Sequence, residues 1–257
     1  MKKILIAVLA AATLFTACKK DTEIIDGPGQ ATIKFDSKVG TSEFELNKEY
    51  IIGRNTYSFN KLRYWVSNVI LVNANGSEYA VPNSYYLIEE TIAVPVQDGA
   101  YTYPATKRDD VTISNIPVGE YKALKFSIGV ESKYNDNLSL QVGELSQLNG
   151  MTNVSWMWHT SYIFSAIGGT INAGLPSKTI KAETGLNTNY KSVTLNLPAT
   201  VKVGSQTSAK IDLTLDVVKV LDGIDLIATP TIGASQATVM SKLAENYTKS
   251  FAVVSGQ

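Results

Sequence analysis

The sequence predicts an all-β protein, an antiparallel β-sandwich of Greek-key type with one short C-terminal helix. Three observations lead to this fold class. Apolar and polar residues alternate over most of the chain after residue 30, which is the spacing of a half-buried strand. Turn residues interrupt the alternating segments at short intervals. Ten or more short strands without intervening helices are typical of a sandwich.

The predicted strands follow one another along the whole chain. Nine of them have clear bounds: residues 31–36, 43–46, 65–72, 78–81, 85–88, 111–113, 121–128, 192–197 and 210–220. The pair Asn75-Gly76 separates the third from the fourth and is typical of a tight hairpin turn. Pro117 and Gly119 indicate a turn before the seventh. Residues 172–177 indicate a loop rather than a domain boundary.

The last predicted strand and the helix lie in the C-terminal quarter. Within residues 210–220, four apolar side chains at every second position share one face. They are Ile211, Leu213, Leu215 and Val217. Residues 236–247 instead place Val239, Leu243 and Tyr247 at every fourth position, which predicts a helix.

Residues 1–17 have the composition of a lipoprotein signal peptide. Lys2 and Lys3 precede an apolar segment, residues 4–15, that is shorter than the roughly 20 residues needed to span a bilayer. Small residues then lead to Cys18, the only cysteine, as in a bacterial lipobox. We therefore expect acyl chains on Cys18 to hold the mature protein on a membrane.

This interpretation divides the chain and places it in the cell. Residues 18–30 are expected to form a polar tether, and residues 31–257 the folded domain. The expected location is the bacterial cell envelope, with the anchor in the outer membrane and the domain facing the periplasm or the surface. The alternative is an ordinary secretory signal in which Cys18 is incidental.

Composition excludes several classes of protein. The 23 basic and 23 acidic residues leave no net positive charge for nucleic-acid binding. One cysteine cannot form an internal disulfide, and one histidine cannot build a site of several imidazoles. Neither a phosphate-binding glycine loop nor a Gly-x-Ser-x-Gly elbow is present. We therefore expect a binding protein and not an enzyme.

The segment of residues 151–164 contains two of the three tryptophans and the only histidine. In a strand, Trp156 and Trp158 would share one face with Tyr162 and Phe164. Met157 and His159 would lie on the other face, where a thioether and an imidazole could bind a soft metal such as copper. The alternative is that the tryptophans belong to the core and that the histidine binds nothing.

Four motifs, which occur along the chain in the same order as in the family, resemble the MbnP-like family of bacterial copper-binding lipoproteins. They are Trp156-x-Trp158-x-x-x-Tyr162-Ile163-Phe164, the segment 61–69, Pro117-x-Gly119-x-Tyr121 with residues 126–130, and Asn246-Tyr247-x-x-x-Phe251. The resemblance implies an exported β-sandwich that binds copper. In some relatives a tryptophan at the site is oxidised to kynurenine, with a haem enzyme as the expected partner. Trp156 and Trp158 are the candidates for that tryptophan.

Three departures from the family pattern concern the metal site. Glu183 stands where many relatives have a histidine, Gly168 replaces a common glutamate, and no histidine occurs in residues 230–257. The resemblance then leaves His159, Met157 and Glu183 as the predicted copper ligands. The alternative function is a metal-free module that binds a glycan or a protein of the cell envelope. An envelope hydrolase is a third hypothesis, although no nucleophile–base pair is visible.

Overall fold

Alternating segments of the sequence form most of the strands in the structure. The computed structural model describes residues 27–153, 161–174 and 176–257. The strands are β1 (Gly29–Val39), β2 (Ser42–Glu43), β3 (Glu49–Ile52), β4 (Asn55–Asn73), β5 (Glu78–Ala80), β6 (Tyr85–Thr91), β7 (Val94–Val96), β8 (Tyr101–Tyr103), β9 (Thr106–Arg108), β10 (Asp110–Ile116), β11 (Gly119–Ile128), β12 (Thr152–Asn153), β13 (Ser161–Asn172), β14 (Lys178–Gly185), β15 (Lys191–Val203), β16 (Ser208–Asp216), β17 (Thr231–Ile232) and β18 (Phe251–Gly256). The helices are α1 (Ser132–Asn135), α2 (Val217–Val220) and α3 (Ala237–Ser250), with 3₁₀ turns η1 (Gln147–Asn149), η2 (Asn187–Asn189) and η3 (Ala234–Gln236).

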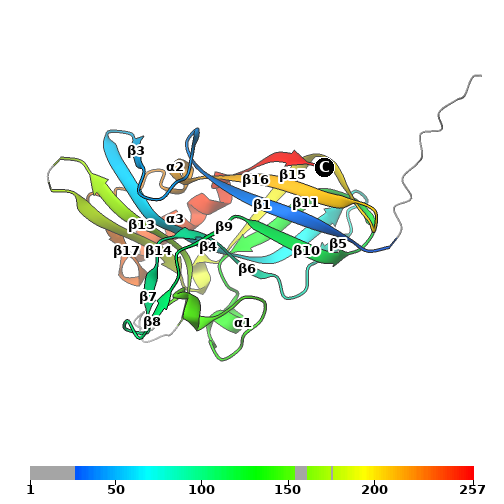
Figure 1. Cartoon of the computed structure of the whole chain (residues 1–257), viewed down its shortest axis with the longest axis horizontal. Coiled ribbons are helices and arrows are strands. Elements are labelled where there is room, and N and C mark those ends of the chain that lie inside the picture. The colour runs from blue at the N-terminus through cyan, green and yellow to red at the C-terminus, as the bar shows by residue number, and fades with distance from the viewer. Residues whose placement is uncertain (1–26, 154–160, 175) are drawn as a thin grey trace, which may run out of the picture.

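Two sheets face each other, and a two-stranded hairpin lies apart from them (Figure 1). The small sheet has the order β10-β1-β16-β18, with β2 beside β1. The large sheet has the order β15-β11-β4-β13-β14-β17, with β3, β5 and β6 on β4, β9 on β6 and β12 on β13. The predicted all-β sandwich of Greek-key type is thus confirmed. Most neighbours are antiparallel as predicted, but β1–β16 and β14–β17 are parallel pairs.

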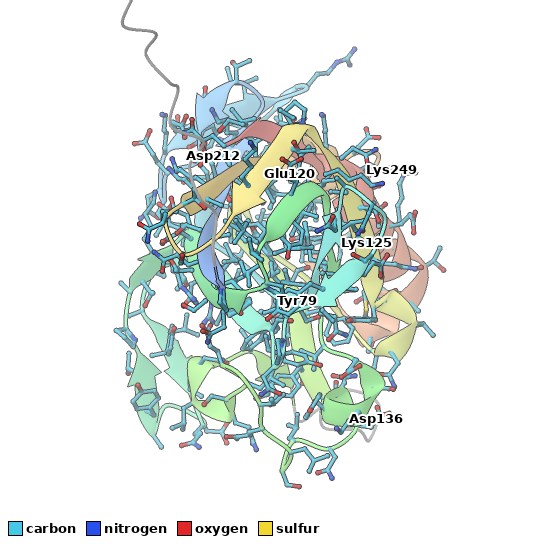
Figure 2. All side chains as sticks on the ribbon, turned by 90° about the vertical axis from the view of Figure 1, so that its right-hand side faces the viewer. Tyr79, Glu120, Lys125, Asp136, Asp212 and Lys249 are labelled. Atoms are coloured by element: carbon cyan, nitrogen blue, oxygen red, sulfur yellow. The ribbon has the colours of Figure 1, made fainter. Side chains whose placement is uncertain are left out.

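The main hydrophobic core fills the space between the two sheets. Phe35 on β1 meets Phe126 on β11 edge-on, with ring centroids 5.7 Å apart. Helix α3 contributes Leu243 and Tyr247, both fully buried. Figure 2 shows the side chains that fill the interior between the two sheets, to which Glu120 on β11 and Asp212 on β16 belong. This packing explains why apolar residues recur at every second position in the strands.

A second core covers the outer face of the large sheet. Along β4 the side chains alternate, so Tyr64 belongs to the main core and Trp65 to the second one. Trp65 contacts Tyr162 edge-on, at 6.0 Å between ring centroids. The covering layer includes α1, η1 and the β7–β8 hairpin, which lie together below the large sheet in Figure 1. Both faces of β4 are therefore buried, which its long apolar sequence reflects.

Several predicted elements are confirmed. Asn75-Gly76 forms the turn between β4 and β5, with Gly76 at a positive φ of 93°. The predicted helix is α3. Of the predicted loop 172–177, Asn172 ends β13, whereas residues 173, 174, 176 and 177 lie outside helices and strands. Within the part of the chain that the structure describes, no helix has the length and apolar character needed to cross a membrane.

Other predicted boundaries were wrong. Strand β1 begins at Gly29, two residues before the predicted strand 31–36, and extends to Val39. Strand β16 ends at Asp216 rather than continuing to residue 220, and α2 follows it. The reason is a helix cap: the Asp216 carboxylate accepts a hydrogen bond from the Val218 amide at 3.0 Å. Helices α1 and α2 are single turns that add to the one predicted helix.

Candidate functional site

Glu183 is the predicted metal ligand whose position the structure describes. His159, Met157, Trp156 and Trp158 lie outside the described residues, as does Cys18 in the predicted signal region. Glu183 lies on β14 and is only 5 % exposed. A carboxylate buried to this degree requires a partner or a function, because burial disfavours its charged form.

Glu183 belongs to a row of side chains that crosses the outer face of the large sheet. On β13 its neighbour is Ala166, and on β4 the neighbour of Ala166 is Arg63. Arg63 in turn faces Glu89 on β6, and Glu89 faces Arg108 on β9. Residues directly opposite on paired strands project on the same side of a sheet. Four charged groups of alternating sign therefore lie in one line across five strands.

Two lysines flank the carboxylate of Glu183. The Lys181 ammonium nitrogen is 3.2 Å from a Glu183 carboxylate oxygen. Burial raises the pKa of Glu183, and the positive charges of Lys181 and Lys61 act against this rise. Burial lowers the pKa of Lys61, and the charge of Glu183 opposes that change. Gly168 lies between the two lysines in the sheet register, and a Cβ there would come within 2.7 Å of the Lys61 side chain.

A cavity of about 600 Å³ opens beside Glu183. Its lining is mostly polar and comes from five parts of the chain. The lining residues are Lys61, Val94, Pro95, Val96, Gln97, Asp98, Gln147, Gly150, Thr152, Asn153, Ile163, Lys181 and Glu183. Asn153 pairs with Ser161 across β12 and β13, so the residues that flank 154–160 lie next to each other near this cavity. The sequence did not predict the cavity, because its walls combine residues of β4, β13 and β14 with turn residues that only the folded chain brings together.

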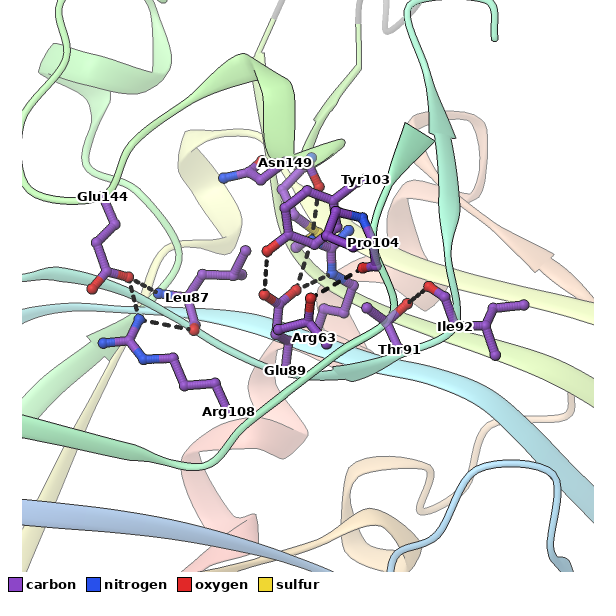
Figure 3. A network of polar contacts seen from close by, with 12 residues as sticks. Arg63, Leu87, Glu89, Thr91, Ile92, Tyr103, Pro104, Arg108, Glu144 and Asn149 are labelled. Carbon is purple, nitrogen blue, oxygen red and sulfur yellow. Dashed lines mark hydrogen bonds and ion pairs between the residues drawn. The ribbon is translucent and has the colours of Figure 1, made fainter. Parts of the chain in front are cut away.

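A buried ion pair holds one wall of the cavity in place (Figure 3). The Arg63 guanidinium is 1 % exposed and donates to the Glu89 carboxylate at 2.7 Å. Arg63 also donates to the Asn149 carbonyl at 2.7 Å and lies 4.8 Å from the ring centroid of Tyr103. Tyr103 donates its hydroxyl to Glu89 at 2.5 Å. One cation thereby connects β6, the β7–β8 hairpin and the η1 turn.

Sequence reasoning missed Arg63 and Glu89. A signal was present, because Arg63 interrupts the apolar part of β4. Its neighbours in the sequence, Leu62 and Tyr64, are both buried. A fully buried arginine is almost always paired with a carboxylate, so the sequence indicated that a partner existed. It did not indicate which of the 23 acidic residues was the partner, because that depends on strand register.

The donor sets differ in how well they fit copper. An imidazole and a thioether, as in His159 and Met157, are ligand types that copper accepts. Glu183 does not fit this role, because its carboxylate is paired with one ammonium group and lies near a second. Within the described residues, no group of three or more histidine, cysteine, aspartate or glutamate side chains could hold a metal ion.

Comparison with known proteins gives one family and one similar structure. The MbnP family profile matches residues 28–241. Among solved structures, MbnP from Methylosinus trichosporium is similar, with 15 % sequence identity and a TM-score of 0.49; the match covers 77 % of this chain and 79 % of that chain. No curated protein sequence matches the chain. Because the family profile extends over most of the sequence, the chain belongs to the MbnP family.

Proposed function

We propose that this protein is an exported, lipid-anchored binding protein of the bacterial cell envelope, and that copper is its ligand. Cys18 carries the lipid in this proposal, and His159 and Met157 bind the metal. Membership of the MbnP family over residues 28–241 is the observation that carries the proposal. The donor chemistry of an imidazole beside a thioether supports it.

The pairing of the residues that flank 154–160 supports the metal proposal. Asn153 and Ser161, which flank the segment containing His159, are paired across β12 and β13. Asn153 lines the Glu183 cavity, and Arg63 holds the turn that leads into β12. We therefore assign Glu183 a supporting role, as the charge partner of Lys181 and not as a ligand.

A copper titration of the full-length protein tests this assignment. We expect the wild-type chain to retain copper after dialysis and His159→Ala to lose it, because the chain has one imidazole. Glu183→Gln should retain copper, since its carboxylate is already paired with Lys181. Metal content per chain can be measured by inductively coupled plasma mass spectrometry. Equal copper in wild type and His159→Ala would rule out His159 as the ligand.

Lipid anchoring is tested by Cys18→Ser in the native host. The wild-type protein is expected to partition into a detergent phase and to carry the mass of its acyl chains, because two or more chains are needed for stable membrane attachment. The variant should appear in the aqueous phase without that mass. A detergent-phase Cys18→Ser protein would contradict the lipid anchor.

One observation favours a second candidate function, a metal-free module that binds a glycan or a protein of the cell envelope. The described lining of the Glu183 cavity contains two ammonium groups, which repel a metal cation. It also contains amide and hydroxyl groups, including Gln97, Gln147 and Thr152, which suit a polar organic ligand. This candidate predicts that neither the wild-type protein nor any variant retains copper.

A further inference from the structure

A second cavity lies on the other side of the wall that Arg63 holds. Its volume is about 300 Å³, at the lower end of the range for small-molecule sites. The β7–β8 hairpin and the η1 turn separate it from the Glu183 cavity: Val96 and Gln147 line that cavity, whereas Tyr101 and Leu148 line this one. Figure 3 shows its polar floor, in which Glu144 and Arg108 lie beside Leu87.

The floor of this cavity is an ion pair fixed to the backbone. The Arg108 guanidinium contacts the Glu144 carboxylate through its Nη1 atom and also donates to the Leu87 carbonyl at 3.3 Å. The same Glu144 oxygen, Oε2, accepts from the Leu87 amide at 3.0 Å. The two side chains thus bond the amide and the carbonyl of Leu87. These bonds fix the orientation of both side chains.

Each member of this ion pair keeps hydrogen-bonding capacity that the described residues do not use. Arg108 bonds through Nη1, which leaves Nε and Nη2 as donors, and Glu144 bonds through Oε2, which leaves Oε1 as an acceptor. Their side chains are 31 % and 37 % exposed. A ligand at this floor therefore meets donors and an acceptor side by side, in fixed positions.

The rim of the cavity is apolar and exposed. Tyr101 is 40 % exposed and Leu148 is 50 % exposed, and both line the cavity. An exposed aromatic ring beside oriented polar groups suits a ligand with one apolar face and several hydroxyl groups. The charges in the floor balance, because Arg108 is paired with Glu144 and Arg63 with Glu89. The balance favours a neutral ligand over an ionic one.

We propose that this cavity, with Arg108 and Glu144 in its floor and Tyr101 at its rim, binds a neutral carbohydrate. The guanidinium donates to one sugar hydroxyl while the free carboxylate oxygen accepts from its neighbour, and the C–H face of the ring packs on Tyr101. None of the described residues that line this cavity is a proposed metal ligand, so the copper experiment and the sugar experiment test different residues.

Saturation-transfer NMR on the full-length protein tests the proposal. The probes are glucose, galactose, mannose and N-acetylglucosamine, each also as a short oligosaccharide, with glucuronate as an anionic comparison. We expect at least one neutral sugar to bind and glucuronate to bind more weakly. Tyr101→Ala and Glu144→Gln should each weaken that binding by roughly tenfold or more, because each removes a contact that water replaces poorly.

A matched control separates the site from a general effect of charge. Glu78→Gln removes a carboxylate that is likewise partly exposed and paired with a cation, Lys125 at 2.6 Å, but on β5. This variant should bind the sugar as the wild type does, and circular dichroism checks that every variant is folded. The proposal is overturned if no neutral sugar binds, or if Tyr101→Ala and Glu144→Gln bind as tightly as Glu78→Gln.

Discussion

Arg63→Met is expected to lower the free energy of unfolding by about 3–5 kcal/mol, because it leaves the Glu89 carboxylate buried without its counter-ion. Glu89 is 5 % exposed, so water cannot replace the lost partner. The Asn149 carbonyl loses its donor as well. Urea unfolding followed by tryptophan fluorescence measures the loss.

Two further variants make this prediction specific. Lys125→Met breaks the more exposed pair with Glu78 and should cost only about 0–1 kcal/mol. The double variant Arg63→Met/Glu89→Leu should be more stable than Arg63→Met alone, because no unpaired charge remains buried. A loss in Arg63→Met as small as that in Lys125→Met would show that the ion pair does not hold the wall between the two cavities.

Gly169→Ala should prevent folding or cost about 3 kcal/mol or more. Gly169 has a φ of +152°, and a Cβ there would lie 2.1 Å from the Ser58 carbonyl oxygen and 2.8 Å from the Phe59 Cα. Both are backbone atoms of β4, the strand that pairs with β13 at this point. Neither can move without breaking that pairing.

A second glycine provides the control for backbone conformation. Gly53 also has a positive φ, +63°, but a Cβ there would meet nothing within 4 Å. Gly53→Ala therefore carries only the conformational cost, about 1–2 kcal/mol. Thermal unfolding of the two variants compares a glycine whose Cβ would clash with backbone atoms to one whose Cβ would meet open space. Equal melting temperatures would contradict the clash at Gly169.

The strands could be predicted because one physical rule governs them. Ile33 and Phe35 alternate with polar residues since one face of β1 packs on the core and the other does not. The rule fails where a local hydrogen bond favours a helical turn over continuation of the strand. Val217 continues the alternation of β16, yet the Asp216 side chain caps a helix at that point. The prediction of strand 210–220 did not take this cap into account.

The covering layer and the parallel pairs could not be predicted in the same way. The layer over the outer face of the large sheet includes η1 and α1, which are too short to show a period. The parallel pairing of β1 with β16 joins residues that are far apart in the sequence. It depends on the packing of the whole sandwich and not on any local preference of β1.

For the candidate site, the sequence indicates residue types but not geometry. The family resemblance makes Glu183 a candidate ligand, and in the structure Glu183 lines a cavity. Its carboxylate pairs with Lys181 on the same strand, and Gly168, which has no side chain, leaves room for Lys61 nearby. Three adjacent strands, β14, β13 and β4, supply Lys181, Gly168 and Lys61, so the strand register brings Lys61 close to Glu183.

Native mass spectrometry of the full-length protein, purified from its own host in detergent, tests the proposed function most directly. It reports the acyl mass on Cys18, any oxidation of Trp156 or Trp158, and bound copper in one spectrum. We expect an acylated chain that carries copper, and His159→Ala prepared in parallel should carry the acyl mass without the metal. A wild-type chain that lacks copper after exposure to it, or a His159→Ala chain that retains it, would contradict copper binding through His159.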